Sequence, residues 1–268
     1  MRAPLFLISL ALSSAACSDS AEYADQAGVD QTQAAGTQTE AAPELEPHSV
    51  EQETERYQFS YAWPVEVAAE PGLAAHLQNR ADAVLAELIK DADEDWNVAE
   101  GQQWTPRQHS VSVEWKVVAD LPRYLSLSGH LATYSGGAHG MSDVQSLVWD
   151  RDAGTALKGV ELFNSPVALE QGLCRRLCNA LIAAREERRG IKVAEGSDDM
   201  FDKCPRLDEA NVLVGSSNGR TFDRLSIYFG PYVAGAYAEG AYQLDFPVTA
   251  SVLDAVKPAH ASAFSVRR

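Results

Sequence analysis

Two glycine-rich loops carry the side chains that are best suited to contacting a ligand. The first loop spans Tyr134–Gly140 and the second spans Phe229–Gly240. Glycine lets backbone N–H groups approach a ligand closely, and Tyr and His rings offer stacking faces and hydrogen bonds that suit a sugar or a partner protein. We therefore predict a ligand-contacting surface that comprises Tyr134, Gly136, Gly137, His139, Tyr232, Tyr237 and Glu239.

A structural role is the competing interpretation of the same residues. Gly136 and Gly137 also suit a tight turn or bulge between two subdomains, His139 a hydrogen-bonded structural imidazole, and Glu239 an acceptor that closes its own loop. The sequence leaves both interpretations open.

A serine-hydrolase motif is formally present, but its context is wrong. The stretch Gly215–Gly219 matches G-x-S-x-G with Ser217 at the nucleophile position, and Asp254 and His260 follow in the order of a hydrolase triad. That motif requires a helix directly after the serine. Residues 220–229 are instead typical of a strand, so we interpret the motif as a hairpin turn.

The sequence does not indicate metal ligation. Residues 91–97 place Asp or Asn at alternate positions, as a calcium loop does, but Trp96 and Gln102 stand where such a loop needs a glycine and a bidentate glutamate. We interpret this stretch as a solvated acidic loop. No two of the six His residues have the spacing of zinc ligands on one helix. We predict neither a metal nor a cofactor.

The first residues are typical of an export signal. Arg2 supplies a positive charge, an apolar run from Pro4 to Leu12 follows, and small residues lead to Cys17. The small-small-Cys ending resembles the bacterial lipobox, in which the cysteine receives a lipid; cleavage after Ala16 without lipidation is the alternative. We predict a signal peptide at 1–16 and a lipid anchor on Cys17 in the outer membrane, facing the periplasm, because Ser18 allows that destination.

The segment that follows has the composition of a tether. Residues 18–55 contain ten carboxylates, no Lys or Arg and one aromatic side chain. Such a segment buries too little apolar surface to offset the entropy of ordering it. We therefore predict an acidic, disordered tether at 17–55.

The overall charge argues against a nucleic-acid partner. The chain has 268 residues, 38 acidic and 22 basic, and a formal net charge of −16. Nucleic-acid binding depends on Lys and Arg contacts to phosphate, which this balance does not favour.

Hydrophobic periodicity predicts the elements of the first half. A period of two over 57–63 and over 111–117 indicates strands, and a third strand is expected over 125–131. Apolar residues three and four apart indicate a helix from Pro71 to Lys90. We assign an N-terminal subdomain to 56–142.

The second half has the same mixture of elements. A hairpin is expected around Asp150–Gly154, and one long helix from Pro166 to Gly190 with Ser165 as its cap. Strands are expected near 211–214, 221–229 and 241–246. We assign a C-terminal subdomain to 143–268. The fold class that follows is α+β, with mixed and antiparallel strands and packed helices in two small subdomains of one compact unit.

Three cysteines remain once Cys17 is set aside. An exported chain with three thiols most simply forms one disulfide, and both Cys174 and Cys178 are candidates to pair with Cys204.

The glycine-rich motifs resemble a known family when they are taken in order. They are the residues 134–139 (Tyr-Ser-Gly-Gly-Ala-His), the triplet Glu161-Leu162-Phe163, and the second loop followed by a strand that ends in Pro247. This combination resembles the PdaC/RsiV-like domain family over most of Arg56–Arg268. The family occurs in the exported part of a lysozyme-sensing anti-sigma factor, as a non-catalytic module beside a peptidoglycan deacetylase domain, and in lipoproteins of unknown function.

The resemblance implies a non-enzymatic binding or sensing module of the cell envelope. Its ligand would be an envelope component, either peptidoglycan or a cationic lytic protein. The resemblance also favours Cys178 and Cys204 as the disulfide pair. The competing hypotheses are an envelope hydrolase that uses Ser217 or a His139/Glu239 pair, and a lysozyme inhibitor that binds the enzyme rather than the sugar.

Overall fold

The computed structural model describes residues 45–194 and 196–267. The predicted signal peptide, the predicted lipidation site Cys17 and the predicted tether as far as residue 44 lie outside the described residues. Within the described part of the chain, no helix combines the length and the apolar character that a membrane crossing requires.

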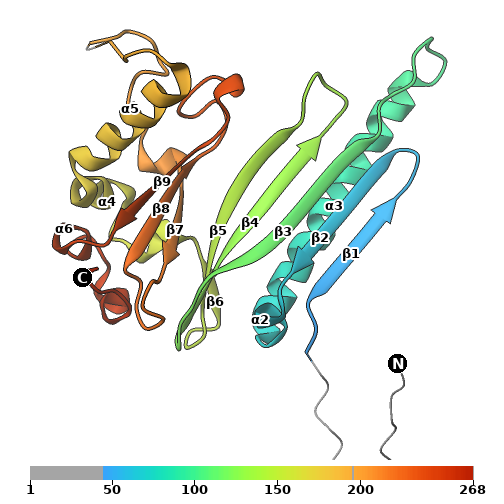
Figure 1. Cartoon of the computed structure of the whole chain (residues 1–268). Coiled ribbons are helices and arrows are strands. Elements are labelled where there is room, and N and C mark those ends of the chain that lie inside the picture. The colour runs from blue at the N-terminus through green and yellow to red at the C-terminus, as the bar shows by residue number, and fades with distance from the viewer. Residues whose placement is uncertain (1–44, 195, 268) are drawn as a thin grey trace, which may run out of the picture. The chain divides into compact units, whose positions relative to one another are not determined.

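The first sheet has six strands, which lie side by side in chain order (Figure 1). Strands β2 and β3 are parallel, and every other neighbouring pair is antiparallel. A parallel pair needs a long crossover, and the two helices α2 and α3 between β2 and β3 supply it. The strands are β1 His48–Glu53, β2 Tyr57–Trp63, β3 His109–Asp120, β4 Tyr124–Tyr134, β5 Met141–Asp150 and β6 Thr155–Leu157; the helices are α2 Val65–Ala68 and α3 Pro71–Ala99.

Helix α3 covers one face of this sheet and builds its hydrophobic core (Figure 1). The period of two predicted for β2 is confirmed, because alternate side chains of this strand are buried beneath the helix. The main buried members of this core are Phe59, Tyr61, Trp63, Leu73, Leu77, Leu88, Val113, Trp115, Leu127 and Leu147.

The long helix extends beyond its predicted end at Lys90 to Ala99. The acidic stretch that we interpreted as a solvated loop therefore lies on the helix. Asp93 forms an ion pair with Arg56 at 2.6 Å, and Asp95 lies 2.9 Å from a nitrogen of the buried His109. Arg56 directly precedes β2 and His109 begins β3, so these partners hold the acidic turns against the sheet.

A glycine and a tryptophan fit closely at the centre of the first sheet. Gly129 on β4 pairs with Trp115 on β3, and a Cβ atom at Gly129 would lie 2.8 Å from the indole ring. The indole Nε1 donates a hydrogen bond of 2.9 Å to the hydroxyl of the buried Tyr61. The ring is thus fixed from both sides.

The second sheet is antiparallel and consists of β7 Asn211–Gly215, β8 Arg224–Phe229 and β9 Tyr242–Pro247. The hairpin turn predicted between β7 and β8 is confirmed, with Gly219 at φ +67°. Strand β8 begins three residues later than expected, because Phe222 pairs with Phe264 in an isolated bridge and Asp223 accepts hydrogen bonds from the turn.

The predicted long helix is two helices, α4 Pro166–Leu173 and α5 Arg175–Arg189. Ser165 caps the first and Gly190 ends the second, as predicted. The break lies at Cys174, whose φ is +51°. Gly172 packs directly on the backbone of Ser251 at the start of α6, Ala250–Leu253, whereas α5 packs on β9. Helices α4 and α5 pack on different elements, so the chain changes direction between them.

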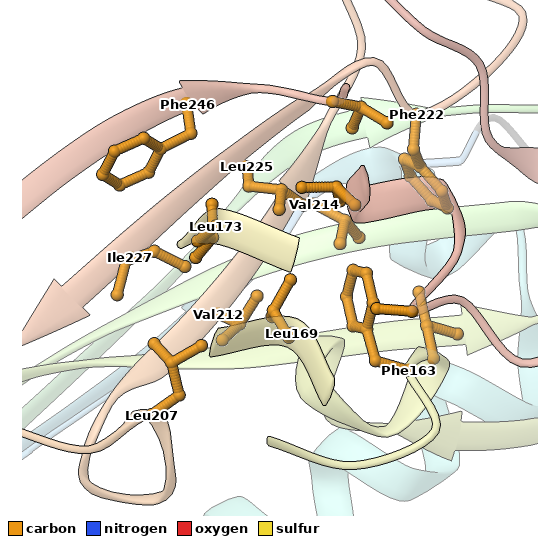
Figure 2. Close-up of a cluster of buried hydrophobic side chains, with 14 of the residues drawn as sticks. Phe163, Leu169, Leu173, Leu207, Val212, Val214, Phe222, Leu225, Ile227 and Phe246 are labelled. Carbon is orange, nitrogen blue, oxygen red and sulfur yellow. The ribbon is translucent and has the colours of Figure 1, made fainter. Parts of the chain in front are cut away.

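The helices and the second sheet enclose a second hydrophobic core (Figure 2). Tyr124 and Val148 of the first sheet also belong to it, so the two layers share a boundary. The predicted α+β class, with two sheets in one compact body, is confirmed. Residues at the centre of this core include Phe163, Leu169, Leu173, Leu207, Val212, Val214, Phe222, Leu225, Ile227 and Phe246. Short 3₁₀ helices lie at Gly159–Leu162, Leu207–Glu209, Tyr237–Glu239 and Pro258–Ala263.

Two predicted boundaries differ from the structure. The first sheet does not stop at residue 142, because β5 and β6 extend it to Leu157. Strand β1 lies within the range expected for the tether, which we had placed at 17–55. It pairs with β2, its Val50 packs on the first core, and its His48 stacks on Trp63 with ring centroids 3.8 Å apart.

The disulfide joins Cys178 of α5 to Cys204, the pair that the family resemblance favoured. Cys174 is exposed and has no disulfide partner among the described residues. The bond ties the loop after α5 back to the helix.

Candidate functional site

The two glycine-rich loops meet at three aromatic side chains. The His139 ring stacks on Tyr237 with centroids 3.7 Å apart, and the Tyr237 hydroxyl donates a 2.7 Å hydrogen bond to the carbonyl of Gly140. The Tyr232 ring lies 5.5 Å from that of Tyr237. We call His139, Tyr232 and Tyr237 the aromatic cluster. The structure thus brings together three of the seven predicted site residues.

Tyr232 combines exposure with an unusual backbone. Its side chain is 50% exposed, and its φ is +69°, a left-handed conformation that bulky residues rarely adopt. Such a conformation costs on the order of 1 kcal/mol and persists only where the surroundings impose it. The loop therefore holds a large ring in solvent at an energetic cost.

A cavity of about 280 Å³ lies beside the aromatic cluster. Strand β4, the start of β5, the second loop and residues 209 and 211 form its walls, and its two carboxylates belong to the half-buried Asp143 and the exposed Glu209. Burial raises the pKa of Asp143, although a backbone hydrogen bond from Val144 lowers it in part. The lining residues are Leu131, Thr133, Met141, Ser142, Asp143, Glu209, Asn211, Gly230, Pro231 and Val233.

Tyr134 and the two glycines of the first loop lie apart from the aromatic cluster. The Tyr134 hydroxyl donates to the carbonyl of Gly137 at 3.0 Å and accepts from Arg107 at 3.3 Å. Gly136 has a φ of +85°, so it provides the turn that the structural interpretation expected. Tyr134 lines a different cavity, between α3 and the first sheet.

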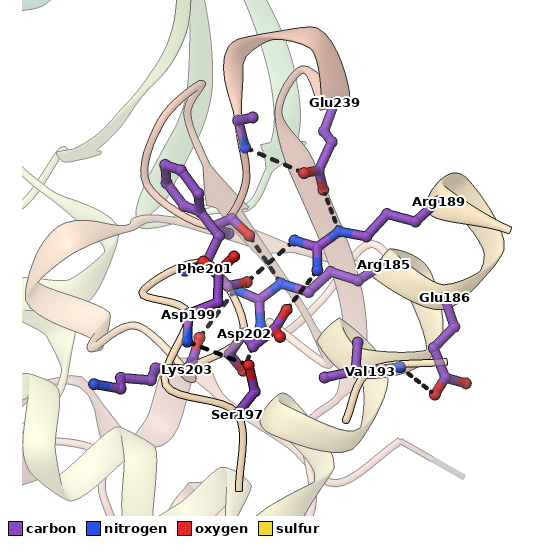
Figure 3. Close-up of polar contacts among 12 residues, drawn as sticks. Arg185, Glu186, Arg189, Val193, Ser197, Asp199, Phe201, Asp202, Lys203 and Glu239 are labelled. Atoms are coloured by element: carbon purple, nitrogen blue, oxygen red, sulfur yellow. Dashed lines mark hydrogen bonds and ion pairs between the residues drawn. The ribbon is translucent and has the colours of Figure 1, made fainter. Parts of the chain in front are cut away.

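Glu239 closes the second loop (Figure 3). Its carboxylate accepts hydrogen bonds from the Tyr242 hydroxyl at 2.5 Å, from Arg189 Nε at 3.0 Å and from the N–H of Ala236 at 3.2 Å. Burial raises the pKa of Glu239, but the hydrogen bonds from Tyr242 and Arg189 outweigh it and hold that pKa below its usual range. The contacts fit the structural interpretation of this residue.

The residue that sequence reasoning missed is Arg185. It is fully buried and donates to the carbonyls of Ala234, Asp202 and Lys203 at 2.8 to 3.0 Å (Figure 3). Burial lowers the pKa of its guanidinium. The spacing carried a sign of this role, because Arg185 continues the four-residue apolar stripe of Leu177 and Leu181.

The hydrolase candidates do not assemble in the structure. Ser217 lies in the turn between β7 and β8 and donates its hydroxyl hydrogen to Asp223, while a ring nitrogen of His260 lies 2.8 Å from the Tyr124 hydroxyl. A strand follows the serine, as predicted, and not the helix that the motif requires. Within residues 45–194 and 196–267, no group of three or more His, Cys, Asp or Glu side chains is arranged to hold a metal ion.

Comparison with known protein families finds a match to the first part of the chain. Residues 50–142 match the family model described as Deacetylase PdaC. The predicted PdaC resemblance is therefore confirmed over this span, which runs from β1 to the start of β5. The second glycine-rich loop, which also carried the resemblance, lies outside the matched residues.

Two solved structures are similar to the chain. A member of the DUF3298 family from Bacteroides fragilis has 14% sequence identity and a TM-score of 0.44, with 76% of this chain and 90% of that chain covered. A DUF3298 family protein from Pseudomonas aeruginosa has 15% identity and a TM-score of 0.46, with 84% and 99% covered. No curated protein matches the sequence.

Proposed function

We propose that this protein is a non-catalytic binding module of the bacterial cell envelope and that its aromatic cluster binds the glycan of peptidoglycan. The observation that carries the proposal is Tyr232, whose half-exposed ring stands on a left-handed backbone beside the stacked rings of His139 and Tyr237. A strained, exposed aromatic residue is expected where a loop is shaped for contact.

The chemistry of the surroundings suits a sugar. Aromatic faces pack on the C–H faces of a sugar ring, while hydroxyl groups take hydrogen bonds from nearby polar groups. The adjacent cavity supplies the Asp143 carboxylate, the Ser142 hydroxyl and the Asn211 amide as such partners. A cavity of about 280 Å³ is close to the lower end of small-ligand sites.

The proposal includes export and a lipid anchor on Cys17, with the protein in the outer membrane facing the periplasm. The apolar run before Cys17 and the acidic composition of the residues that follow it support the anchor. The Cys17→Ala variant should move the protein from the membrane fraction to the soluble periplasmic fraction. A variant that stays with membranes would contradict the anchor.

The main test is co-sedimentation of the full chain with intact peptidoglycan sacculi. We expect the protein to sediment with sacculi and to release no fragments into the supernatant. Tyr232→Ala should weaken binding about tenfold, because exposed aromatic anchors dominate such contacts. Trp104→Ala is the matched control, since Trp104 is 51% exposed and lies outside the aromatic cluster.

Two results would overturn parts of the proposal. Released fragments that appear with the wild type would show catalysis and restore the hydrolase hypothesis. Equal binding by Tyr232→Ala and the wild type, with both proteins folded, would remove the aromatic cluster from the site.

A cationic lytic protein is the second candidate ligand, and the formal net charge of −16 favours it. Attraction between a strongly acidic chain and a basic enzyme is screened by salt, whereas stacking on a neutral sugar is not. Binding to lysozyme that falls steeply between low and physiological salt, with no binding to sacculi, would select this candidate.

A further inference from the structure

A second cavity lies between α3 and the first sheet, away from the aromatic cluster. It has a volume of about 450 Å³, within the range of small-molecule sites. We call it the helix–sheet cavity. Its walls come from the middle of α3 and from strands β2 to β5, and Tyr134 and Ser135 contribute from the start of the first loop. The lining residues are Tyr61, Arg80, Val84, Glu87, Leu88, Asp91, His109, Ser110, Val111, Val113, Leu131, Thr133, Tyr134, Ser135 and Gln145.

The cavity lies where the packing between helix and sheet becomes incomplete. Near the start of α3, Leu73 and Leu77 are fully buried against the sheet. Further along, the apolar side chains of Val84, Val111 and Leu131 are only partly buried, although they point into the same layer. Protein interiors are normally close-packed, so apolar side chains left half-covered around one hollow indicate room for an apolar guest.

The most buried polar residue in the lining of the cavity is Tyr61. Tyr61 is only 1% exposed, and its oxygen accepts a hydrogen bond from Trp115 Nε1 at 2.9 Å. Its own O–H has no acceptor among the described residues. A buried donor without an acceptor is costly, so this hydroxyl is available for an acceptor atom of a ligand.

A cation in the same lining lies over the tryptophan that donates to that hydroxyl. The Arg80 guanidinium lies 5.2 Å above the indole ring of Trp115, which is the hydrogen-bond partner of Tyr61. Arg80 donates to the amide oxygen of Gln145 and forms no ion pair with a carboxylate in the described part of the chain. One end of the cavity therefore offers an unused O–H donor together with a positive charge.

The other end of the cavity is acidic. Glu87 and Asp91 follow Arg80 on the same helix, so they lie roughly 10 and 16 Å further along its axis. Val84 and Leu88 line the stretch between the two ends. The cavity thus has a positive end, an apolar middle and a negative end, so a charged ligand would bind in one orientation.

We propose that the helix–sheet cavity binds a small amphiphile that has an apolar body of medium length and a carboxylate head. The head accepts hydrogen bonds from the Tyr61 hydroxyl and lies beside Arg80, while the body packs on Val84, Val111, Val113 and Leu131. The inference goes beyond the proposed binding of glycan, because it concerns a different surface.

Calorimetric titration of the full chain with octanoate tests the inference, with octylammonium as a probe of equal length and opposite charge. We expect saturable binding of octanoate and at least tenfold weaker binding of octylammonium. Tyr61→Phe removes the unused donor together with the acceptor of Trp115 Nε1, and should weaken octanoate binding about five- to tenfold. Tyr57→Phe, four residues earlier on the same strand and outside the lining, is its matched control and should bind as the wild type does.

Filling the cavity provides the second arm. Val84→Trp should abolish octanoate binding, whereas Ala83→Trp, the exposed neighbour outside the lining, should leave it unchanged. Circular dichroism establishes that each variant is folded, and Val111→Phe serves as a filling variant from the sheet side if Val84→Trp does not fold.

Three results would overturn the inference. They are the absence of saturable octanoate binding to the wild type, octylammonium binding as strong as that of octanoate, and unchanged octanoate binding in the folded filling variants. Tyr232→Ala should leave octanoate binding intact, so failure of this inference is distinguishable from failure of the proposed glycan binding.

Discussion

The two glycine-rich loops are held in place by different means. The first loop is a short connection between two long strands, β4 and β5, whose ladder fixes both of its ends. The second connects β8 and β9 over a longer irregular path, and α5 supplies cations to its carbonyl groups. Arg185 donates to Ala234, and Arg188 donates to Glu239 and Ala241. An irregular loop needs such partners because its backbone groups have no strand to pair with.

The comparison shows that the conformation of the second loop is held by contacts with other segments of the chain. Arg185 also donates to the carbonyls of Asp202 and Lys203, directly before the disulfide-bonded Cys204. The disulfide, α5 and the second loop thus form one connected support. The first loop is anchored by the β4–β5 ladder, and its outside partners are the Tyr237 hydroxyl, which donates to Gly140, and Arg107, which donates to Tyr134.

The largest expected effect comes from breaking this support at the disulfide. Cys178→Ala with Cys204→Ala opens a loop of 26 residues and should lower the free energy of unfolding by roughly 3 to 4 kcal/mol on the chain-entropy model. Urea denaturation measures the loss. Cys174→Ser, which changes an exposed thiol, is the control and should cost little.

Hydrogen exchange on the same double variant tests the comparison itself. Exchange should rise in residues 196–204 and in the second loop and stay unchanged in β4 and β5, which hold the first loop. Equal loss of protection in β4 and β5 would show that the two loops share one support.

A smaller effect is expected from the ion pair between Arg123 and Asp150. This pair lies at the end of the β4–β5 ladder that is opposite the first loop. Arg123 donates to both carboxylate oxygens of the buried Asp150 at 3.0 and 2.7 Å, and its hydrogen bonds hold the pKa of Asp150 below the usual range. Because the pKa of Asp150 is lower in the folded state than in the unfolded state, its ionisation stabilises the fold at pH values above the unfolded pKa of about 4. This stabilisation is lost as the pH falls through the folded pKa. Asp150→Asn should cost about 2 kcal/mol at pH 7.

The pH dependence separates this ion pair from a general loss of packing. The difference in unfolding free energy between wild type and Asp150→Asn should be constant above about pH 5 and shrink toward pH 2. Thermal unfolding across this range measures it. A difference that does not change with pH would assign the cost to packing.

The smallest effect concerns the backbone of Tyr232. Because its φ of +69° suits glycine better than alanine, Tyr232→Gly should be more stable than Tyr232→Ala by about 0.5 to 1 kcal/mol. Both variants remove the ring and should bind sacculi equally weakly. If the alanine variant is the more stable, the second loop does not impose the left-handed conformation, and the contrast between the two loops weakens.

Most strands were predicted from local sequence patterns, because hydrophobic periodicity and turn residues depend on neighbours only a few residues apart in the sequence. The alternation in 57–63 and the turn at Asn218-Gly219 are of this kind. Strand β1 escaped prediction because its polar sequence offers one apolar anchor, Val50. The bend at Cys174 escaped because the local pattern fits one continuous helix, and packing of Gly172 on Ser251 decides the outcome.

The candidate site was predictable only in part. The sequence predicted that the two loops act together, and the contact between His139 and Tyr237 brings them side by side. It gave no direction for the side chains of Tyr134 and Glu239, which depend on partners far along the chain, Arg107 and Arg189. The helix–sheet cavity was not predictable, because period alone does not show how completely two layers meet.

The fit between Gly129 and Trp115 has a consequence for how related sequences can differ. With 2.8 Å between the indole and a Cβ atom at position 129, a larger residue there is tolerated only if the tryptophan becomes smaller at the same time. Neither change alone preserves the layer, since the first creates a clash and the second a void. Among related sequences, positions 115 and 129 should therefore change together, that is, they should co-vary.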